Sequence, residues 1–120
     1  MRGATVGVLE RNGYSVLVAL DPEEALRLAI RHPRPINLVV SDVVMPKMSG
    51  PAMLKELRGH RPDLKALLIS GYAGEVLSAR GELEGDVPFL EKPFTVSGLL
   101  TKVRQILDAV PAGASTGGGG

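Results

Sequence analysis

Three short apolar runs, separated by stretches with helical spacing, most constrain how this chain folds. The runs lie within residues 38–41, 66–69 and 87–91, and each of these segments is followed by a polar residue. Strands buried on both faces read as continuous apolar runs, and their alternation with helices is typical of a parallel sheet covered by helices. The sequence therefore predicts an α/β domain with a doubly wound parallel sheet in three layers, α/β/α.

The polar residues that follow the three runs are chemically complementary. Asp42, Ser70 and Lys92 supply a carboxylate, a hydroxyl and an ammonium group. In open α/β sheets ligands bind at the carboxyl edge of the strands, where these three side chains are expected to meet. An acid, a hydroxyl and a lysine at three strand ends can surround one phosphoryl group. The sequence therefore predicts a phosphoacceptor site.

With these motifs in place, residues 1–109 resemble the receiver (response-regulator) domains of two-component signalling. The resemblance depends on Asp42, Met45-Pro46, Gly50, Ser70-Gly71-Tyr72-Ala73 and Lys92-Pro93-Phe94. The spacings also agree, with 28 positions from Asp42 to Ser70 (70 − 42) and 22 from Ser70 to Lys92 (92 − 70). The resemblance implies a flavodoxin-like (CheY-like) sheet. The alternation of helices and strands also predicts a strand from Tyr14 to Leu20, after the turn at Arg11-Asn12-Gly13.

The resemblance assigns Asp42 as the phosphoacceptor, and a carboxylate can form an acyl phosphate as a nucleophile. Lys92 would pair with the phosphoryl oxygens, and Ser70 would donate a hydrogen bond to the same group. The remaining phosphoryl-binding groups would be the backbone N–H groups of Val43, Val44 and Gly71. The peptide before Pro93 is expected to be cis, an uncommon and position-specific feature.

Ser70 and Phe89 are the expected switch residues. By resemblance, phosphorylation draws the Ser70 hydroxyl inward and the Phe89 ring follows, which changes the face built by the fourth helix, fifth strand and fifth helix. Such a change is a population shift between two packings. Phe89 as an ordinary core residue is the alternative.

One departure from the family matters. Receivers begin with a strand that ends in two acidic residues, which hold Mg²⁺, and in this chain that strand would fall before Met1. The expected metal ligands are then Asp42, the Val44 carbonyl and waters, so weak Mg²⁺ binding is predicted. Three arrangements remain open: residues 14–20 pair directly with 38–41, a strand is borrowed from another chain (a homodimer or strand exchange), or the sequence starts inside a complete domain.

The other elements follow from local signals. Asp21, Pro22 and Glu24 predict the start of a helix that runs to about residue 32. Further helices are expected over 51–60, 74–80 and 96–109. Residues 1–12 are read as a helix, with a hairpin over 5–19 as the alternative. Residues 110–120 form a flexible Gly-rich tail.

Composition narrows the function classes. The net charge is +1, with basic residues scattered along the chain, so no nucleic-acid partner is expected. The absence of cysteine excludes disulfides and thiolate catalysis. No apolar run approaches membrane-spanning length, so no membrane partner and a cytoplasmic location are expected.

The leading hypothesis is a non-enzymatic receiver that accepts a phosphoryl group on Asp42 from a histidine kinase or a histidine phosphotransfer protein. The Ser-Gly-Tyr-Ala context resembles receivers attached to hybrid sensor kinases. The alternative is a degenerate receiver that binds partners without phosphorylation. A hydrolase of the haloacid dehalogenase type is disfavoured, because it needs a second Asp where this chain has Val44.

Overall fold

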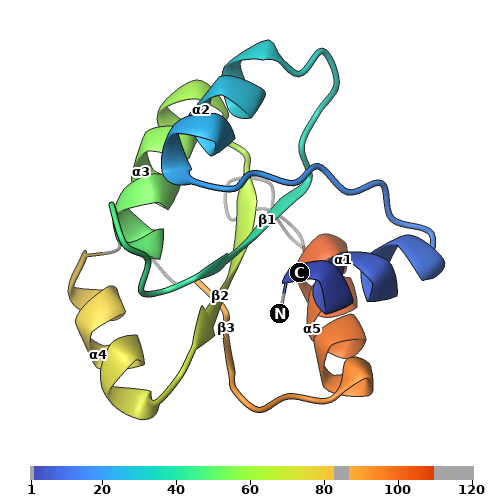
Figure 1. The fold of residues 1–120 in the computed structure, drawn as a ribbon, viewed down its shortest axis with the longest axis vertical. Coiled ribbons are helices and arrows are strands. Elements are labelled where there is room, and N and C mark those ends of the chain that lie inside the picture. The colour runs from blue at the N-terminus through green and yellow to red at the C-terminus, as the bar shows by residue number, and fades with distance from the viewer. Residues whose placement is uncertain (1, 83–86, 110–120) are drawn as a thin grey trace, which may run out of the picture.

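The computed structural model describes residues 2–82 and 87–109. In chain order the elements are α1 (Arg2–Arg11), α2 (Pro22–Arg31), β1 (Leu38–Asp42), α3 (Gly50–His60), β2 (Lys65–Ser70), α4 (Ala73–Glu82), β3 (Phe89–Glu91) and α5 (Val96–Asp108) (Figure 1). None of these helices, over the ranges just given, is long and apolar enough to cross a bilayer. The tail predicted over 110–120 lies outside the described residues.

The described strands form one parallel sheet in the order β1-β2-β3. Leu38 of β1 lies opposite Lys65 of β2, and Asp42 lies opposite Ile69. On the other edge of β2, Ser70 lies opposite Glu91 of β3. The predicted parallel α/β arrangement is therefore confirmed.

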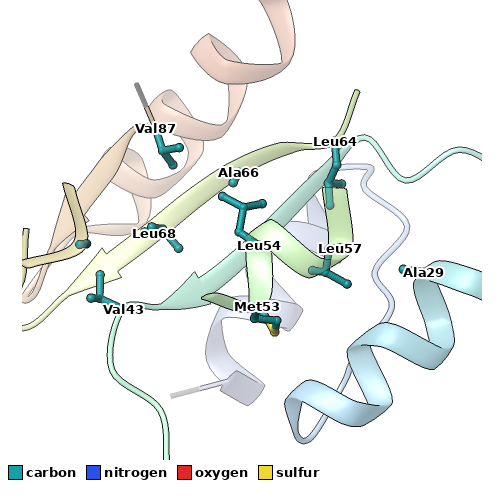
Figure 2. Close-up of a cluster of buried hydrophobic side chains, with 10 residues drawn as sticks. Ala29, Val43, Met53, Leu54, Leu57, Leu64, Ala66, Leu68 and Val87 are labelled. Atoms are coloured by element: carbon teal, nitrogen blue, oxygen red, sulfur yellow. The ribbon is translucent and has the colours of Figure 1, made fainter. Parts of the chain in front are cut away.

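Two clusters of buried apolar side chains cover the two faces of this sheet. The first cluster joins β2 to α2, α3 and α4, and Figure 2 shows its side chains around α3 and the strands. The second cluster joins β2 to α1 and α5. Ala66 and Leu68 enter the first cluster, whereas Leu67 and Ile69 enter the second. This alternation follows from the two-residue period of a strand, and it confirms the predicted three layers.

Side-chain caps fix where three of the helices begin. Asp21 Oδ1 accepts a hydrogen bond from the Glu24 N–H at 2.8 Å, as the sequence predicts for the start of α2. This hydrogen bond holds the pKa of the Asp21 carboxyl below its usual value. Ser49 and Thr95 cap α3 and α5 in the same way. These contacts satisfy backbone donors that the first turn of a helix leaves unpaired.

The strand predicted over Tyr14 to Leu20 is wrong. The segment is a loop that runs from α1 to α2, and the described residues show no ladder between it and β1 (Figure 1). Tyr14 and Val16 pack against the second cluster, but Leu20 is 68% exposed. A strand needs a ladder of hydrogen bonds to a neighbouring strand, and among the described residues no such ladder involves residues 14–20. Pairing with a borrowed strand stays a prediction.

The helix expected near the N-terminus is confirmed, and the hairpin alternative is wrong. Helix α1 extends to Arg11, and its Leu9 is buried in the second cluster. Gly13 follows it with a φ of 91°, a left-handed conformation that glycine adopts without steric cost. The Tyr14 N–H then donates to the Leu9 carbonyl at 3.1 Å, which satisfies one of the last carbonyls of the helix.

Gly50 is the point of closest approach between α3 and the end of β1. A Cβ built on Gly50 would lie 2.3 Å from the backbone oxygen of Asp42 and 3.2 Å from Leu68 Cδ2. The Gly50 N–H also donates to the Val43 carbonyl at 2.8 Å. Only a residue without a side chain fits here, so glycine at this position sets the place of Asp42.

Replacing Gly50 by alanine is expected to destabilise the domain by about 1–3 kcal/mol, because the new methyl group must push the β1 backbone away. The matched control is Gly59→Ala on the same helix, where a Cβ meets nothing within 4 Å. That control is expected to be neutral or to stabilise by up to about 1 kcal/mol. Urea unfolding of both variants measures the difference. Equal stabilities would contradict the close approach.

Arg61, the residue that follows α3, forms hydrogen bonds with the end of α2. Its guanidinium donates to the carbonyls of Ala29 at 2.6 Å, His32 at 2.6 Å and Arg34 at 2.9 Å. These carbonyls lie in the last turn of α2 or follow it, where a helix leaves its acceptors unpaired and favours a cation. The contact therefore joins two helices that pack side by side on one face of the sheet.

Arg61→Ala is expected to lower the free energy of unfolding by about 2–3 kcal/mol, because hydrogen bonds from a charged donor to three carbonyls are lost. Arg34→Ala is the control, since the exposed Arg34 contributes only its backbone carbonyl to this contact. It is expected to change stability by no more than about 0.5 kcal/mol. Thermal and urea unfolding measure both variants, and a silent Arg61→Ala would refute the role given to the guanidinium.

Candidate functional site

The three residues predicted from the strand ends lie at one edge of the sheet. Asp42 ends β1, Ser70 ends β2 and Lys92 follows β3. Hydrogen bonds continue past the strand ends, since the Val43 N–H donates to the Ile69 carbonyl at 2.9 Å and the Lys92 N–H donates to the Ser70 carbonyl at 2.8 Å. The backbone of all three segments is thereby held in register up to the site.

Asp42 and Lys92 form an ion pair. The Lys92 Nζ lies 3.4 Å from Asp42 Oδ1, and the side chains are 33% and 47% exposed, respectively. The Lys92–Pro93 peptide is cis, as the resemblance implies. Ion pairs this exposed contribute little to stability. The carboxylate therefore remains open to an incoming group, with a cation already beside it.

Ser70 is fully buried, at 0% exposure, and its hydroxyl has no hydrogen-bond partner among the described residues. Buried hydroxyl groups in folded proteins are nearly always paired, because an unpaired one costs about 1–3 kcal/mol. Ser70 lies one residue beyond Ile69, which is opposite Asp42 in the register. The structure thus holds an unused donor at the same edge of the sheet as the carboxylate and the lysine.

The three backbone N–H groups predicted to bind phosphoryl oxygens differ in the structure. The Val43 N–H is already bonded to the Ile69 carbonyl, so Val43 does not belong to the set of available donors. The Gly71 N–H donates to Glu75 Oε1 at 2.5 Å. For the Val44 N–H, within the described part of the chain, no hydrogen bond is present, and the Val44 side chain is exposed.

Glu75 is the residue at this site that sequence reasoning missed. It lies in the first turn of α4 and is half-buried. The sequence does contain a signal for this contact: Glu75 lies four positions after Gly71, and Gly71 follows a strand. A side chain at that spacing can reach back to the glycine N–H. An acidic residue in the first turn of a helix is common for other reasons, since it complements the helix dipole.

Phe89, the predicted switch aromatic, is half-buried in β3 and packs against the first cluster. The Arg80 guanidinium carbon of α4 lies 5.7 Å from the centroid of its ring. A cation at this distance over an aromatic face is attracted to it. The ring therefore sits between the core and a surface cation, and its role as a switch stays a prediction.

The predicted metal ligands are few. Over residues 2–82 and 87–109, no three or more acidic or histidine side chains gather where they could hold a metal ion. Asp42 supplies one carboxylate, and the Val44 carbonyl follows two residues later in the chain. Mg²⁺ sites in proteins use one or two carboxylates together with waters and phosphate oxygens. The described residues therefore supply only the minimum of such a site.

Comparison with known proteins agrees with this geometry. The family model for the response regulator receiver domain matches residues 1–104. The chain belongs to the response regulator receiver family. It is 30% identical over 109 residues to the response regulator receiver protein CpdR of Brucella abortus, a match that covers 91% of this chain and 89% of CpdR.

A second relative is much longer than this chain. The chain is 38% identical over 108 residues to the sensor kinase CckA of Brucella abortus, which covers 90% of this chain but only 11% of the kinase. Similarly, it spans 42% of the response regulator MprA of Mycobacterium leprae. The chain therefore spans less than half the length of each of these two relatives.

Solved receiver structures have the same fold. The receiver domain of the hybrid histidine kinase CckA aligns with a TM-score of 0.72 and 37% identity, covering 88% of each chain. A CheY-like receiver domain from Methanospirillum hungatei aligns with a TM-score of 0.75 and 28% identity, covering 89% of this chain and 84% of that one. The CheY-like fold predicted from the sequence is thereby confirmed.

Ser70→Ala is expected to raise stability by about 1–3 kcal/mol, because it removes a buried hydroxyl that has no partner. Ser41→Ala is the matched control at the neighbouring strand, where the Ser41 hydroxyl donates to the Asp42 carbonyl at 2.9 Å. That control is expected to lose about 1 kcal/mol. Urea unfolding decides: a clear loss of stability in Ser70→Ala would mean that its hydroxyl is paired in solution.

Proposed function

We propose that this receiver accepts a phosphoryl group on Asp42 and that the phosphorylated form presents an altered face to a partner. The observation that carries the proposal is the pairing of Asp42 with Lys92 at 3.4 Å, at the sheet edge where Ser70 has a buried, unpartnered hydroxyl. A phosphoryl group on Asp42 would give the lysine a stronger anionic partner. It would also give the Ser70 hydroxyl an acceptor. The same ligand would then engage both the lysine and the unpaired hydroxyl.

The proposed reaction is a phosphoryl transfer from a phosphohistidine. An Asp42 carboxylate oxygen attacks phosphorus, a P–O bond forms, the P–N bond breaks and the imidazole leaves with the electron pair. Such transfers require positioning and charge neutralisation more than covalent assistance from the protein. Lys92 supplies the positive charge, and Ser70 and the Val44 N–H supply hydrogen bonds to the phosphoryl oxygens.

Mg²⁺ is expected to bind weakly and mainly in the presence of a phosphoryl group. Asp42 and the Val44 carbonyl would hold it, with waters and phosphoryl oxygens completing the octahedral shell that this cation prefers. When bound, it would offset negative charge on the transferring group. Lys92 remains the cation that the chain itself brings to Asp42.

The phosphodonor is proposed to be a histidine kinase or a histidine phosphotransfer protein, with the cytoplasm as the compartment. Similarity to the receiver segment of the sensor kinase CckA supports a donor of this class. The chain is not proposed to be an enzyme, because the carboxylate that reacts is itself modified.

The proposed output is a change in packing around Phe89. Phe89 lies three residues before Lys92 in the chain, and the Arg80 guanidinium carbon of α4 lies 5.7 Å from its ring centroid. Movement of Ser70 toward a phosphoryl group would alter the space beside β3, since Leu68 of β2 pairs with Phe89 in the register. The surface of α4, β3 and α5 is therefore the proposed partner-binding face.

Intact mass after incubation with acetyl phosphate, with and without Mg²⁺, tests the phosphoacceptor. The wild-type protein is expected to gain one phosphoryl group faster when Mg²⁺ is present, and Asp42→Asn is expected to gain none. Asp63→Asn, at an exposed position away from the site, is the matched control and is expected to behave as wild type. No gain in a folded wild-type protein would contradict the proposal and favour an interaction module that works without phosphorylation.

A further inference from the structure

The Glu75 carboxylate covers the backbone of Gly71, the residue that follows Ser70. Its Oε1 accepts the hydrogen bond from the Gly71 N–H at 2.5 Å. A Cβ built on Gly71 would lie 3.5 Å from each of the two Glu75 carboxylate oxygens. The carboxylate therefore lies against this glycine with both oxygens close.

The position matters because Gly71 lies at the strand end where the phosphoryl group is proposed to bind. Its N–H is one of the donors that the resemblance assigns to the phosphoryl oxygens, and it is occupied by an anion from the chain itself. A phosphoryl group carries negative charge and accepts hydrogen bonds from the same kind of donor. Glu75 and the phosphoryl group thus compete for the Gly71 N–H, and their charges repel.

The structure also leaves space for the carboxylate to move. Glu75 lines a hollow of ≈ 190 Å³ between α4 and the loop that follows β1. Val43 and Val44 form the wall of this hollow next to Asp42, and Ser78, one turn further along α4, lines it as well. This hollow is the open space next to the Glu75 side chain when the carboxylate releases Gly71.

We infer that Glu75 is a built-in competitor that restrains phosphorylation of Asp42 by occupying the Gly71 N–H and placing negative charge at the phosphoryl site. This inference rests on the proposed function. Phosphorylation then requires the carboxylate to leave Gly71, and the departure couples the first turn of α4 to the chemical state of Asp42. A partner that binds α4 and draws Glu75 away would speed phosphorylation by the same route.

A purely structural role for Glu75 makes a different prediction. An acid in the first turn of a helix complements the helix dipole, and its hydrogen bond to Gly71 tightens the turn between β2 and α4. If that were its whole role, Glu75→Gln would leave the rate of phosphorylation unchanged or reduce it. Glutamine keeps a hydrogen-bond acceptor and removes only the charge, so it separates the two readings.

The experiment compares time courses of the mass gain with acetyl phosphate for wild type, Glu75→Gln, Glu75→Ala and the control Glu56→Gln, an exposed acid on α3. Both Glu75 variants are expected to be phosphorylated about two- to fivefold faster than wild type, the size of effect that a partly exposed charge interaction gives. Glu56→Gln is expected to match wild type. Thermal unfolding of each variant checks that it is folded.

A second measurement reports on the contact without any phosphodonor. Exchange of the Gly71 amide proton with solvent is expected to be faster in Glu75→Ala than in wild type, and unchanged in Glu56→Gln. Equal, non-zero rates of phosphorylation in wild type and the Glu75 variants would overturn the inference while leaving the proposed function intact. Absence of a mass gain in every folded variant would contradict the proposed function and this inference with it.

Discussion

Strand β2 is hydrogen-bonded along both of its edges, to β1 and to β3, and its side chains are buried on both faces of the sheet. Leu67 and Leu68 are both 0% exposed, and they belong to opposite clusters. Every described helix layer therefore packs onto the same strand from one side or the other. Burial of this kind provides most of the free energy that holds a small domain together. It also fixes β2 against sliding, because a shift of one residue would exchange its two faces.

The fixed register of β2 is what turns three separate sequence positions into one site. Asp42 lies opposite Ile69, and Ser70 lies opposite Glu91, so the next residues along each strand meet at the same edge. Gly50 adds a constraint from the other side, because α3 begins directly against the Asp42 backbone. The place of the carboxylate is therefore set by backbone packing, and its side chain remains half exposed.

Much of this arrangement was predictable because it depends on local patterns. Short stretches of sequence determine the apolar runs that form β1, β2 and β3. The same holds for the capping residues that start α2 and α5. The segment from Tyr14 to Leu20 was misjudged because a strand exists only with a neighbour, and neighbours are a property of the whole sheet. The donors around Asp42 were misjudged for a similar reason: the Val43 N–H continues the ladder to β2, which depends on register. The contact of Glu75 with Gly71 was missed because it depends on the conformation of the turn between β2 and α4.

The polar groups of the site contribute little to the stability of the fold. An exposed pair such as Asp42 with Lys92 contributes roughly 0–1 kcal/mol. The unpaired hydroxyl of Ser70 costs about 1–3 kcal/mol, so the two together do not stabilise the fold. Nearby polar groups that only support the structure are paired, as Ser41 is with the Asp42 carbonyl. Ser41 and Ser70 are both buried near the end of a strand, but only the Ser41 hydroxyl has a hydrogen-bond partner. The Ser41 hydroxyl therefore supports the structure, whereas the Ser70 hydroxyl is available to a ligand. Glu75 adds a second carboxylate that accepts a hydrogen bond at this edge, from the Gly71 N–H. Under the proposed function, a phosphoryl group on Asp42 would give the Ser70 hydroxyl the acceptor that it lacks.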